Sequence, residues 1–389
     1  MATGSEEGGV RRTTIAMHEL IVSPFLDDCL VLRPGSPTGL KIPARKYQEL
    51  GQAAAAGDVC PAWLVDAARR LWDLDIAGCP VGETVIVRTR SPYRFGRVSY
   101  ELNLGCNYDC EHCYLGLKRF EGLSWPDRER LLRIMRDAGV LWLQLTGGEP
   151  LIAKLFTQVY GLAYELGMMI SISSNGSRLY RPQILDLLAT RRPYRVTLSV
   201  YGATAEAYDR SHPTTGVLQS VHQRAVGRAR GLSAAQPQPD RHAAQRPRGR
   251  SDDRPGRTLW AGPSRLANMA PTIYGGAESL PAQSVTHLRK RKPFTGCNAG
   301  HTFFHVDPHG MASICKVGRD PQIPLMTEGV EGLRRLGGIA DSLLLRQGGC
   351  TGCALSGTCG TCMPLVTLYR KAKAPLSAYC QHDRGGDAA

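Results

Sequence analysis

Three closely spaced cysteines lie between a strand-like segment and a helix-like segment, and this pattern constrains the fold more than any other feature. They read Cys106-x3-Cys110-x2-Cys113 in the run LNLGCNYDCEHCYLG. A loop with this spacing holds three thiolates. Three ligands on a four-iron cluster leave one iron open to a small molecule, whereas a structural zinc site is normally closed by four protein ligands. The loop therefore predicts a reactive iron–sulfur site.

Around this loop, segments with strand character alternate with segments of helical periodicity. The first helix is expected after Ser124, a typical N-cap with Pro126 in the first turn, and is expected to stop at Gly139. The predicted strands cover residues 97–105, 140–145, 168–173 and 196–202, and the predicted helices cover 125–138, 152–166 and 182–190.

Strands followed by helices at this spacing predict a parallel sheet, curled into a full or partial barrel. Polar or glycine-rich sequences follow each predicted strand: the cysteine loop, GGEP at 147–150, SSNG at 173–176 and SVYG at 199–202. Because the carboxyl ends of parallel strands share one edge, these sequences are expected to converge on one pocket. Tyr201, Asp209 and His305 are further polar candidates near its mouth, each equally compatible with a structural role.

These motifs resemble those of the radical S-adenosylmethionine (radical SAM) enzymes. The resemblance implies a partial (β/α)6 TIM-like barrel whose three loop cysteines hold a [4Fe-4S] cluster, with the amine and carboxylate of SAM chelating the fourth iron. It also implies the following SAM contacts: Gly147, Gly148, Glu149 and Pro150 at the methionyl amine, Asn175 and Ser199 near the ribose and methionyl groups, and His112 bordering adenine.

A second group of cysteines lies in the last hundred residues and exceeds the needs of one tetrahedral site. Pairs of the Cys-x2-Cys type also serve zinc ribbons, which is the alternative for this region. The pattern is similar to the SPASM extension of radical SAM enzymes, except that the block ends x2-Cys362 where x3 is usual. By resemblance, one auxiliary [4Fe-4S] cluster would use Cys350, Cys353, Cys359 and Cys380, and a second would use Cys297, Cys315 and Cys362, one ligand short.

The first 95 residues carry no catalytic motif and predict a small α+β module. A hairpin across residues 26–28, an amphipathic helix in WLVDAARRLWDLDIAG and a strand in TVIVRT suggest a winged-helix-like unit. It resembles the leader-peptide recognition domains of peptide-modifying radical SAM enzymes, which bind a precursor at a sheet edge. The alternative is a structural cap over the barrel. The predicted domains are thus 1–95, a radical SAM core at 96–285 and an auxiliary cluster domain at 286–389.

Residues 225–263 depart from the pattern, because their Arg-, Pro- and Gln-rich sequence lacks strand or helix periodicity where the next strand is expected. Composition favours a disordered insertion. Because the stretch replaces a strand rather than adding to one, we hypothesise that it is translated from a shifted reading frame. An apolar alternating strand in another frame of the coding DNA would support this hypothesis, and its absence from both would end it.

Composition limits the class of protein. A 42% hydrophobic content supports real cores, and no apolar run reaches the roughly 20 residues needed to cross a bilayer. The polar start MATGSEEGGVRRTT argues against a secretory signal, so a cytoplasmic protein is expected, with Cys29, Cys60 and Cys79 as buried hydrophobes. The net charge of +14 is inflated by the 225–263 stretch, so neither a nucleic-acid partner nor a membrane is predicted.

The predicted function is oxidative modification of a ribosomally made precursor peptide, such as formation of a thioether or carbon–carbon crosslink. Its cofactors would be SAM, the SAM-binding cluster and two auxiliary clusters, and its reductant a flavodoxin or ferredoxin. The alternatives are maturation of a protein side chain, as in sulfatase activation, maturation of a small cofactor, or a catalytically dead homologue that only binds peptide.

Overall fold

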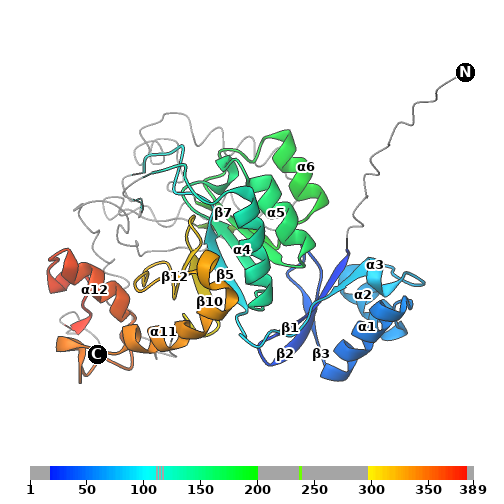
Figure 1. The fold of residues 1–389 in the computed structure, drawn as a ribbon, viewed down its shortest axis with the longest axis horizontal. Coiled ribbons are helices and arrows are strands. Elements are labelled where there is room, and N and C mark those ends of the chain that lie inside the picture. The colour runs from blue at the N-terminus through cyan, green and yellow to red at the C-terminus, as the bar shows by residue number, and fades with distance from the viewer. Residues whose placement is uncertain are drawn as a thin grey trace, which may run out of the picture.

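The fold was determined as a computed structural model of the 389-residue chain. It describes residues 18–110, 113, 115, 118–199, 236–238 and 297–382, and for 236–238 the backbone only. Figure 1 shows an N-terminal module at one side, a central sheet with its helices, and a C-terminal region at the opposite side.

The N-terminal module is a four-stranded sheet covered by three helices. Its strands are β1 (Leu20–Phe25), β2 (Asp28–Leu32), β3 (Gly39–Ile42) and β4 (Val85–Val87), in the order β3-β2-β1-β4, with β4 parallel to β1. Its helices are α1 (Ala44–Ala56), α2 (Ala62–Trp72) and α3 (Val81–Thr84). The expected hairpin is confirmed, because β1 and β2 pair antiparallel around Leu26, whose φ is 53°.

Helix α1 and strand β3, together with the four-residue α3, were not predicted from the sequence. Helix α1 buries only Leu50 fully and is otherwise rich in Ala, so its apolar periodicity is weak. Strand β3 has four residues and lies at the sheet edge, with alternating exposed positions. Tertiary packing therefore decides these two elements more than local pattern does.

The central sheet confirms the predicted α/β architecture of parallel strands alternating with helices. Its core strands are β5 (Arg97–Glu101), β6 (Trp142–Thr146), β7 (Met169–Ser174), β8 (Arg195–Ser199) and β9 (Gln236–Gln238), all parallel in this order. The intervening helices are α4 (Trp125–Asp137), α5 (Phe156–Glu165) and α6 (Pro182–Thr190). Among the described residues β9 and β12 are the edges, so this sheet is open rather than a closed barrel.

Two expectations in this region were wrong. The second helix was expected from residue 152, but the structure has a 3-10 turn at Pro150–Ile152 and begins α5 only at Phe156. The stretch 225–263 was interpreted as lacking the strand that the fold requires there, yet Gln236–Gln238 pairs with Thr197–Ser199 of β8. Pairing with a neighbouring strand needs only backbone groups, so a short polar segment can form a strand that side-chain periodicity does not reveal. The rest of 225–263 lies outside the described residues.

The C-terminal region extends the same sheet from its other edge. Strand β10 (Phe303–Val306) runs parallel to β5, and β11 (Met311–Ser313) and β12 (Ile323–Pro324) follow antiparallel. Beyond them lie α10 (Leu325–Glu328), a 3-10 segment Gly329–Arg335, α11 (Leu336–Leu344), a turn at Gly348–Cys350, α12 (Met363–Lys371) and a last turn at Leu376–Ala378. The expected boundary at 285/286 falls outside the described residues.

The N-terminal module packs against the end of the sheet where its strands begin. Ile21 and Leu32 form one buried cluster with Leu141 and Met169, which lie at the starts of β6 and β7. The ring of Phe25 meets Trp142 edge-on at 4.7 Å between centroids. The module therefore closes the end opposite to the carboxyl ends of the strands.

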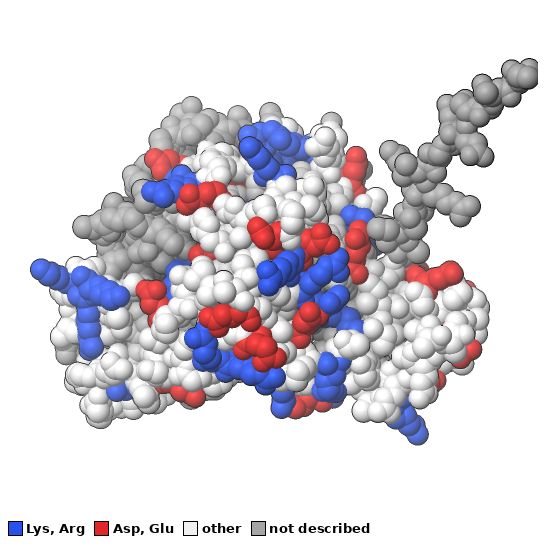
Figure 2. Space-filling view, in the orientation of Figure 1, with Lys and Arg blue, Asp and Glu red and all other residues white. Residues whose placement is uncertain are grey.

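No helix in the described part of the chain is both long and apolar enough to cross a membrane. On the face shown in Figure 2, basic and acidic side chains are intermixed. Several of them form surface pairs, such as Arg133 with Glu129 at 2.6 Å along α4. Such pairs contribute little to stability.

Candidate active site

The cysteine loop and the GGEP sequence meet at the carboxyl ends of β5 and β6. The backbone N–H of Gly148 donates to the carbonyl of Asn103 at 3.0 Å, and that of Glu149 donates to Gly105 at 2.9 Å. A Cβ on Gly147 would lie 2.2 Å from the Asn103 oxygen, and a Cβ on Gly148 would lie 2.2 Å from the Gly105 oxygen. The two glycines are therefore needed because the two loops touch backbone to backbone.

Glu149 ties GGEP to the end of β7. Its side chain is completely buried, and its carboxylate accepts hydrogen bonds from Leu151 N (2.9 Å), Ser174 Oγ (2.8 Å) and Asn175 N (2.7 Å). Burial raises the pKa of Glu149 to about 7, against these hydrogen bonds and Arg178, which lower it. Since three protein donors already occupy the carboxylate, its observed role is to join the strand ends.

Asn175 links the end of β7 to the cysteine loop. Its amide Nδ2 lies 3.7 Å from Cys106 Sγ and donates to Asn107 Oδ1 at 3.1 Å. Asn107 in turn donates to Ser177 Oγ at 3.0 Å. The structure therefore brings together the first three of the expected sequences: the cysteine loop, GGEP and SSNG.

The three loop thiols are close enough to interact. Burial raises the pKa of Cys110 to about 12, and the neighbouring thiols of Cys113 and Cys106 add to the rise. Burial likewise raises the pKa of Cys106. Within the described ranges, no three His, Cys, Asp or Glu side chains are arranged to hold a single metal ion. The donor set of three thiols on one loop fits a thiolate-held iron–sulfur cluster, which would supply positive charge to stabilise these thiolates.

Asn103 is a candidate residue that sequence reasoning missed. Its side chain is 5% exposed, and neither amide atom has a hydrogen-bond partner among the residues that the structure describes. Buried amides nearly always have hydrogen-bond partners, so a buried amide without one beside the cysteine loop indicates a place for a polar ligand. The available signal was spacing: Asn103 continues the alternation of Ser99 and Glu101 and lies three residues before Cys106.

One face of the central sheet is apolar and packs under α4, α5 and α6, while the other is polar. Residues such as Tyr100, Leu143 and Ile172 belong to the apolar core. The strand register aligns polar residues in two rows on the opposite face: His305, Ser99, Gln144 and Ser171 in one, and Glu101, Thr146, Ser173 and Thr197 in the next. Closed TIM barrels fill the corresponding face with branched apolar residues. In this protein the two polar rows make that face a polar wall.

Three of the C-terminal cysteines, Cys297, Cys315 and Cys362, interact electrostatically. Burial raises the pKa of Cys362, and the thiols of Cys315 and Cys297 raise it further. These three thiols, from segments far apart in the sequence, therefore lie near one another. Cys315 Sγ also accepts a hydrogen bond from Gly318 N at 3.1 Å.

The other set lies around the loops before and after α12. Cys353 N donates to Cys350 O at 3.4 Å. The segment after Cys359 is held to the segment of Cys380 by Gly360 N on Gln381 Oε1 (3.0 Å) and by Thr361 Oγ1 on Tyr379 O (3.0 Å).

The remaining expected site residues divide into three groups. Pro150 is buried at the start of a 3-10 turn beside Glu149, and Ser199 ends β8, two strands from GGEP. His112, Tyr201 and Asp209 lie outside the described residues. His305 is 1% exposed on β10 and faces Glu101, so it belongs to a buried network rather than to an open mouth.

Comparison with known families agrees with this geometry. Residues 100–229 match the family model of the Radical SAM superfamily. This range contains the cysteine loop, GGEP and Asn175. Residues 100–229 therefore match a superfamily whose members use a [4Fe-4S] cluster and SAM.

Individual relatives share this region. The chain is 32% identical over 140 residues to a probable GTP 3',8-cyclase of Thermococcus kodakarensis, a match covering 33% of this chain and 45% of that protein. It is 31% identical over 116 residues to the mycofactocin maturase MftC of Mycobacterium ulcerans, covering 29% and 31%. The chain thus spans less than half of the length of these relatives.

The fold is similar over nearly the whole chain to that of SuiB from Streptococcus suis, solved in complex with the precursor peptide SuiA. The TM-score is 0.56 at 12% sequence identity, covering 95% of this chain and 98% of SuiB. The likeness extends beyond the radical SAM region.

Proposed function

We propose that this protein is a radical SAM enzyme that oxidatively modifies a ribosomally made precursor peptide. The observation that carries the proposal is the meeting of the cysteine loop, GGEP and Asn175 at one edge of a parallel sheet. Cys106, Cys110 and Cys113 would hold the [4Fe-4S] cluster, which, when reduced with SAM bound, would supply a 5′-deoxyadenosyl radical for abstraction of a hydrogen atom from substrate.

The residues around that group would act by binding and orientation. Gly147 and Gly148 bring backbone groups close to the cysteine loop, where the methionyl amine of SAM would lie. The Asn103 amide, which has no partner within the described ranges, would offer a donor and an acceptor there. The buried Glu149 holds the two strand ends in register, which keeps these groups at fixed positions.

A peptide substrate is supported by the polar wall and by the relatives. Rows of Ser, Thr and Gln offer hydrogen-bond partners to a peptide backbone, which an apolar barrel interior does not. SuiB has this fold and was solved with a precursor peptide, and MftC is named a maturase.

The N-terminal module is proposed to recognise the precursor at the edge of β3. This strand ends its sheet, so a peptide can add a strand there through main-chain hydrogen bonds. Because the module packs at the starts of β6 and β7, the bound segment and the modified residues would lie at opposite ends of the sheet. The precursor must therefore have separate recognition and modified segments.

The C-terminal region is proposed to be a SPASM domain with two auxiliary clusters. The nearness of Cys297, Cys315 and Cys362 supports the first cluster. The loops that hold Cys359 and Cys380 together support the second. Each cluster would accept an electron from the substrate radical and pass it on, so that abstraction of hydrogen ends in net oxidation of the peptide.

The decisive assay uses the anaerobically reconstituted full chain with flavodoxin or dithionite as reductant. Deoxyadenosine is measured with and without the peptide encoded by a short open reading frame beside the gene, and the peptide is weighed by mass spectrometry. Deoxyadenosine together with loss of hydrogen from the peptide supports the proposal. Deoxyadenosine with an unchanged peptide favours another substrate, such as a sulfatase-type protein or a small cofactor, and none under any condition favours a peptide-binding homologue without activity.

The matched control compares two cysteine variants. Cys106→Ala is expected to lose SAM cleavage entirely, because it removes one of three cluster ligands. Cys79→Ala, a partly exposed cysteine of the N-terminal module, is expected to retain it. Equal activity in both variants would refute the assignment of the loop.

A further inference from the structure

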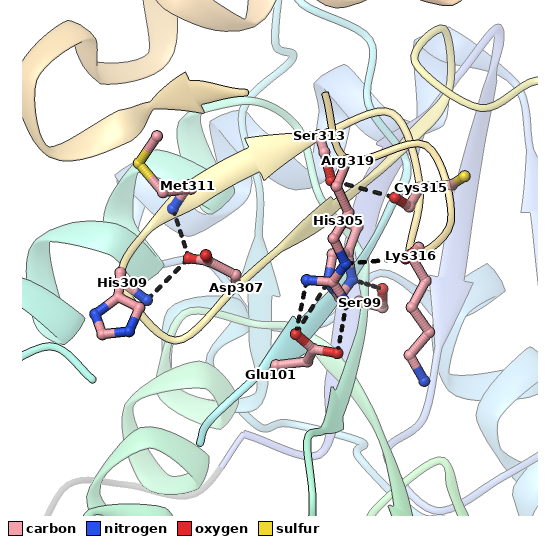
Figure 3. A network of polar contacts seen from close by, with 10 residues as sticks. All are labelled: Ser99, Glu101, His305, Asp307, His309, Met311, Ser313, Cys315, Lys316 and Arg319. Atoms are coloured by element: carbon pink, nitrogen blue, oxygen red, sulfur yellow. Dashed lines mark hydrogen bonds and ion pairs between the residues drawn. The ribbon is translucent and has the colours of Figure 1, made fainter. Parts of the chain in front are cut away.

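A buried charge cluster joins β5 to the segment that follows Cys315 (Figure 3). The guanidinium of Arg319 donates to both oxygens of Glu101, with Nη1–Oε2 at 3.1 Å and Nη2–Oε1 at 2.9 Å. His305 Nε2 lies 3.3 Å from the same Oε2. The exposed fractions of Glu101, His305 and Arg319 are 0%, 1% and 7%, so all three side chains are shielded from water.

Side chains of this region also form hydrogen bonds with the backbone next to Cys315. Arg319 Nε donates to the carbonyl of Lys316 at 3.0 Å, and Ser313 Oγ donates to the carbonyl of Cys315 at 3.2 Å. On the other side, His305 Nδ1 lies 2.7 Å from Ser99 Oγ, which comes from the same strand as Glu101. Arg319 is thus a bridge between a core strand and the Cys315 loop.

The hairpin that carries this loop is itself held in shape. Asp307 Oδ1 accepts hydrogen bonds from His309 N and Met311 N, both at 2.9 Å, which fixes the turn between β10 and β11 (Figure 3). The β10–β11 hairpin is therefore expected to move as one rigid unit. Its docking against β5 then helps to determine where Cys315 lies.

The two partners of the ion pair stand close in sequence to the two groups of cysteines. Glu101 lies five residues before Cys106, and Arg319 lies four residues after Cys315. A buried bidentate pair has one favoured geometry, and breaking it leaves a charge without a partner in a dry interior. Movement of one cysteine loop relative to the other therefore requires separation of this pair.

We propose that Glu101, His305 and Arg319 are positioning residues that hold the Cys315 loop at a fixed place relative to the Cys106 loop. We call these three residues the clamp. The inference rests on the proposed function in one respect: the Cys315 and Cys106 loops would carry an auxiliary cluster and the SAM-binding cluster, so the clamp would set the separation of the two clusters. The hydrogen bonds of the clamp are all made between protein groups, so they can be tested without bound clusters.

The first test therefore uses the metal-free full chain. The alkylation rate of Cys315 by iodoacetamide is followed by mass spectrometry in wild type, Arg319→Lys and Arg319→Gln. Without the bidentate pair the loop opens more often, and we expect Cys315 to react about threefold faster in the Lys variant and about tenfold faster in the Gln variant. Buried Cys29, in the N-terminal module, is the internal reference and should not change.

A matched control breaks an ion pair of similar length elsewhere. Arg191 Nη2 lies 3.0 Å from Glu165 Oε1 on the helical side of the sheet. Arg191→Gln should leave the Cys315 rate unchanged. If Arg319→Gln does not fold, Arg319→Lys and Ser99→Ala, which removes only the tether of His305, provide the test. Unchanged Cys315 reactivity in every folded clamp variant would overturn the proposal.

The second test uses reconstituted protein and a spectroscopic signature. In Arg319→Lys the electron paramagnetic resonance signal of the auxiliary cluster should change in shape or lose at least about half of its intensity, while the signal of the SAM-binding cluster stays as in wild type. Identical auxiliary signals would count against the clamp. Failure of the proposed function is a separate result, because it appears as wild-type protein that makes no deoxyadenosine.

Discussion

The carboxylate of Glu149 and the backbone N–H of Asn175 are joined by a 2.7 Å hydrogen bond across the carboxyl ends of β6 and β7. The same carboxylate accepts hydrogen bonds from Ser174 and Leu151, so one buried acid joins GGEP to the end of β7. A second buried acid, Glu101, ties the same edge of the sheet to the C-terminal region. The two acids have opposite dependence on pH.

Glu149 should make the fold less stable as pH rises. Its pKa in the folded state is raised by burial to about 7 from 4.5. Its contribution to stability is therefore fully present below pH 4.5 and is lost as pH rises to 7, by about 3 kcal/mol over the whole range. Urea unfolding of metal-free wild type and Glu149→Gln at pH 5 and pH 8 measures it: the stability difference between the two proteins should change by about 2–3 kcal/mol. A difference that is the same at both pH values would contradict the assignment.

Glu101 should show the reverse. Burial alone would raise the pKa of this carboxyl, but His305, Arg319 and Lys316 together hold it lower, at about 2. Its contribution is present above pH 4.5 and is lost as pH falls towards 2. Between pH 7 and pH 3 the advantage of wild type over Glu101→Gln should shrink by about 2 kcal/mol. An advantage that grows on acidification would show that the carboxyl is not stabilised in its charged form.

Gly148→Ala should disrupt the site more than its small size suggests. The added Cβ would meet the Gly105 carbonyl at 2.2 Å, and this is backbone that cannot rotate away. We expect a loss of about 3 kcal/mol or more in unfolding free energy, and loss of iron from the reconstituted protein. Gly51→Ala in α1 is the control, because a Cβ there meets nothing within 4 Å and should stabilise the helix by about 0.5–1 kcal/mol. Normal iron content in Gly148→Ala would refute the close approach.

Asn103→Leu should separate stability from SAM binding. The amide has no hydrogen-bond partner in the described part of the chain, so replacing it with an apolar side chain should leave the metal-free protein as stable as wild type, or more stable by about 1 kcal/mol. SAM affinity of the reconstituted protein, measured by calorimetry, should fall at least about fivefold, since a group that can bind SAM is lost. A strongly destabilised variant with normal SAM affinity would instead give Asn103 a structural role.

The α/β core could be predicted because its signals are local. The cap at Ser124, the stop at Gly139 and the helix at 182–190 all depend on residues adjacent in the sequence, and the structure has them where expected. The convergence of Cys106, Glu149 and Asn175 was also predictable, since parallel strands must place their carboxyl ends together. Helix α1 and the three-residue β9 escaped prediction, because neither carries strong periodicity.

What the sequence by itself determined is the chemistry: which thiols, glycines and amides stand at the ends of which strands. What only the tertiary structure decided is which distant groups meet, such as Arg319 with Glu101 or Cys315 with Cys362. These contacts join residues far apart in the chain, and their geometry comes from the docking of the β10–β11 hairpin on β5. Docking depends on the shape of both surfaces at once, and no local pattern of residues contains that information.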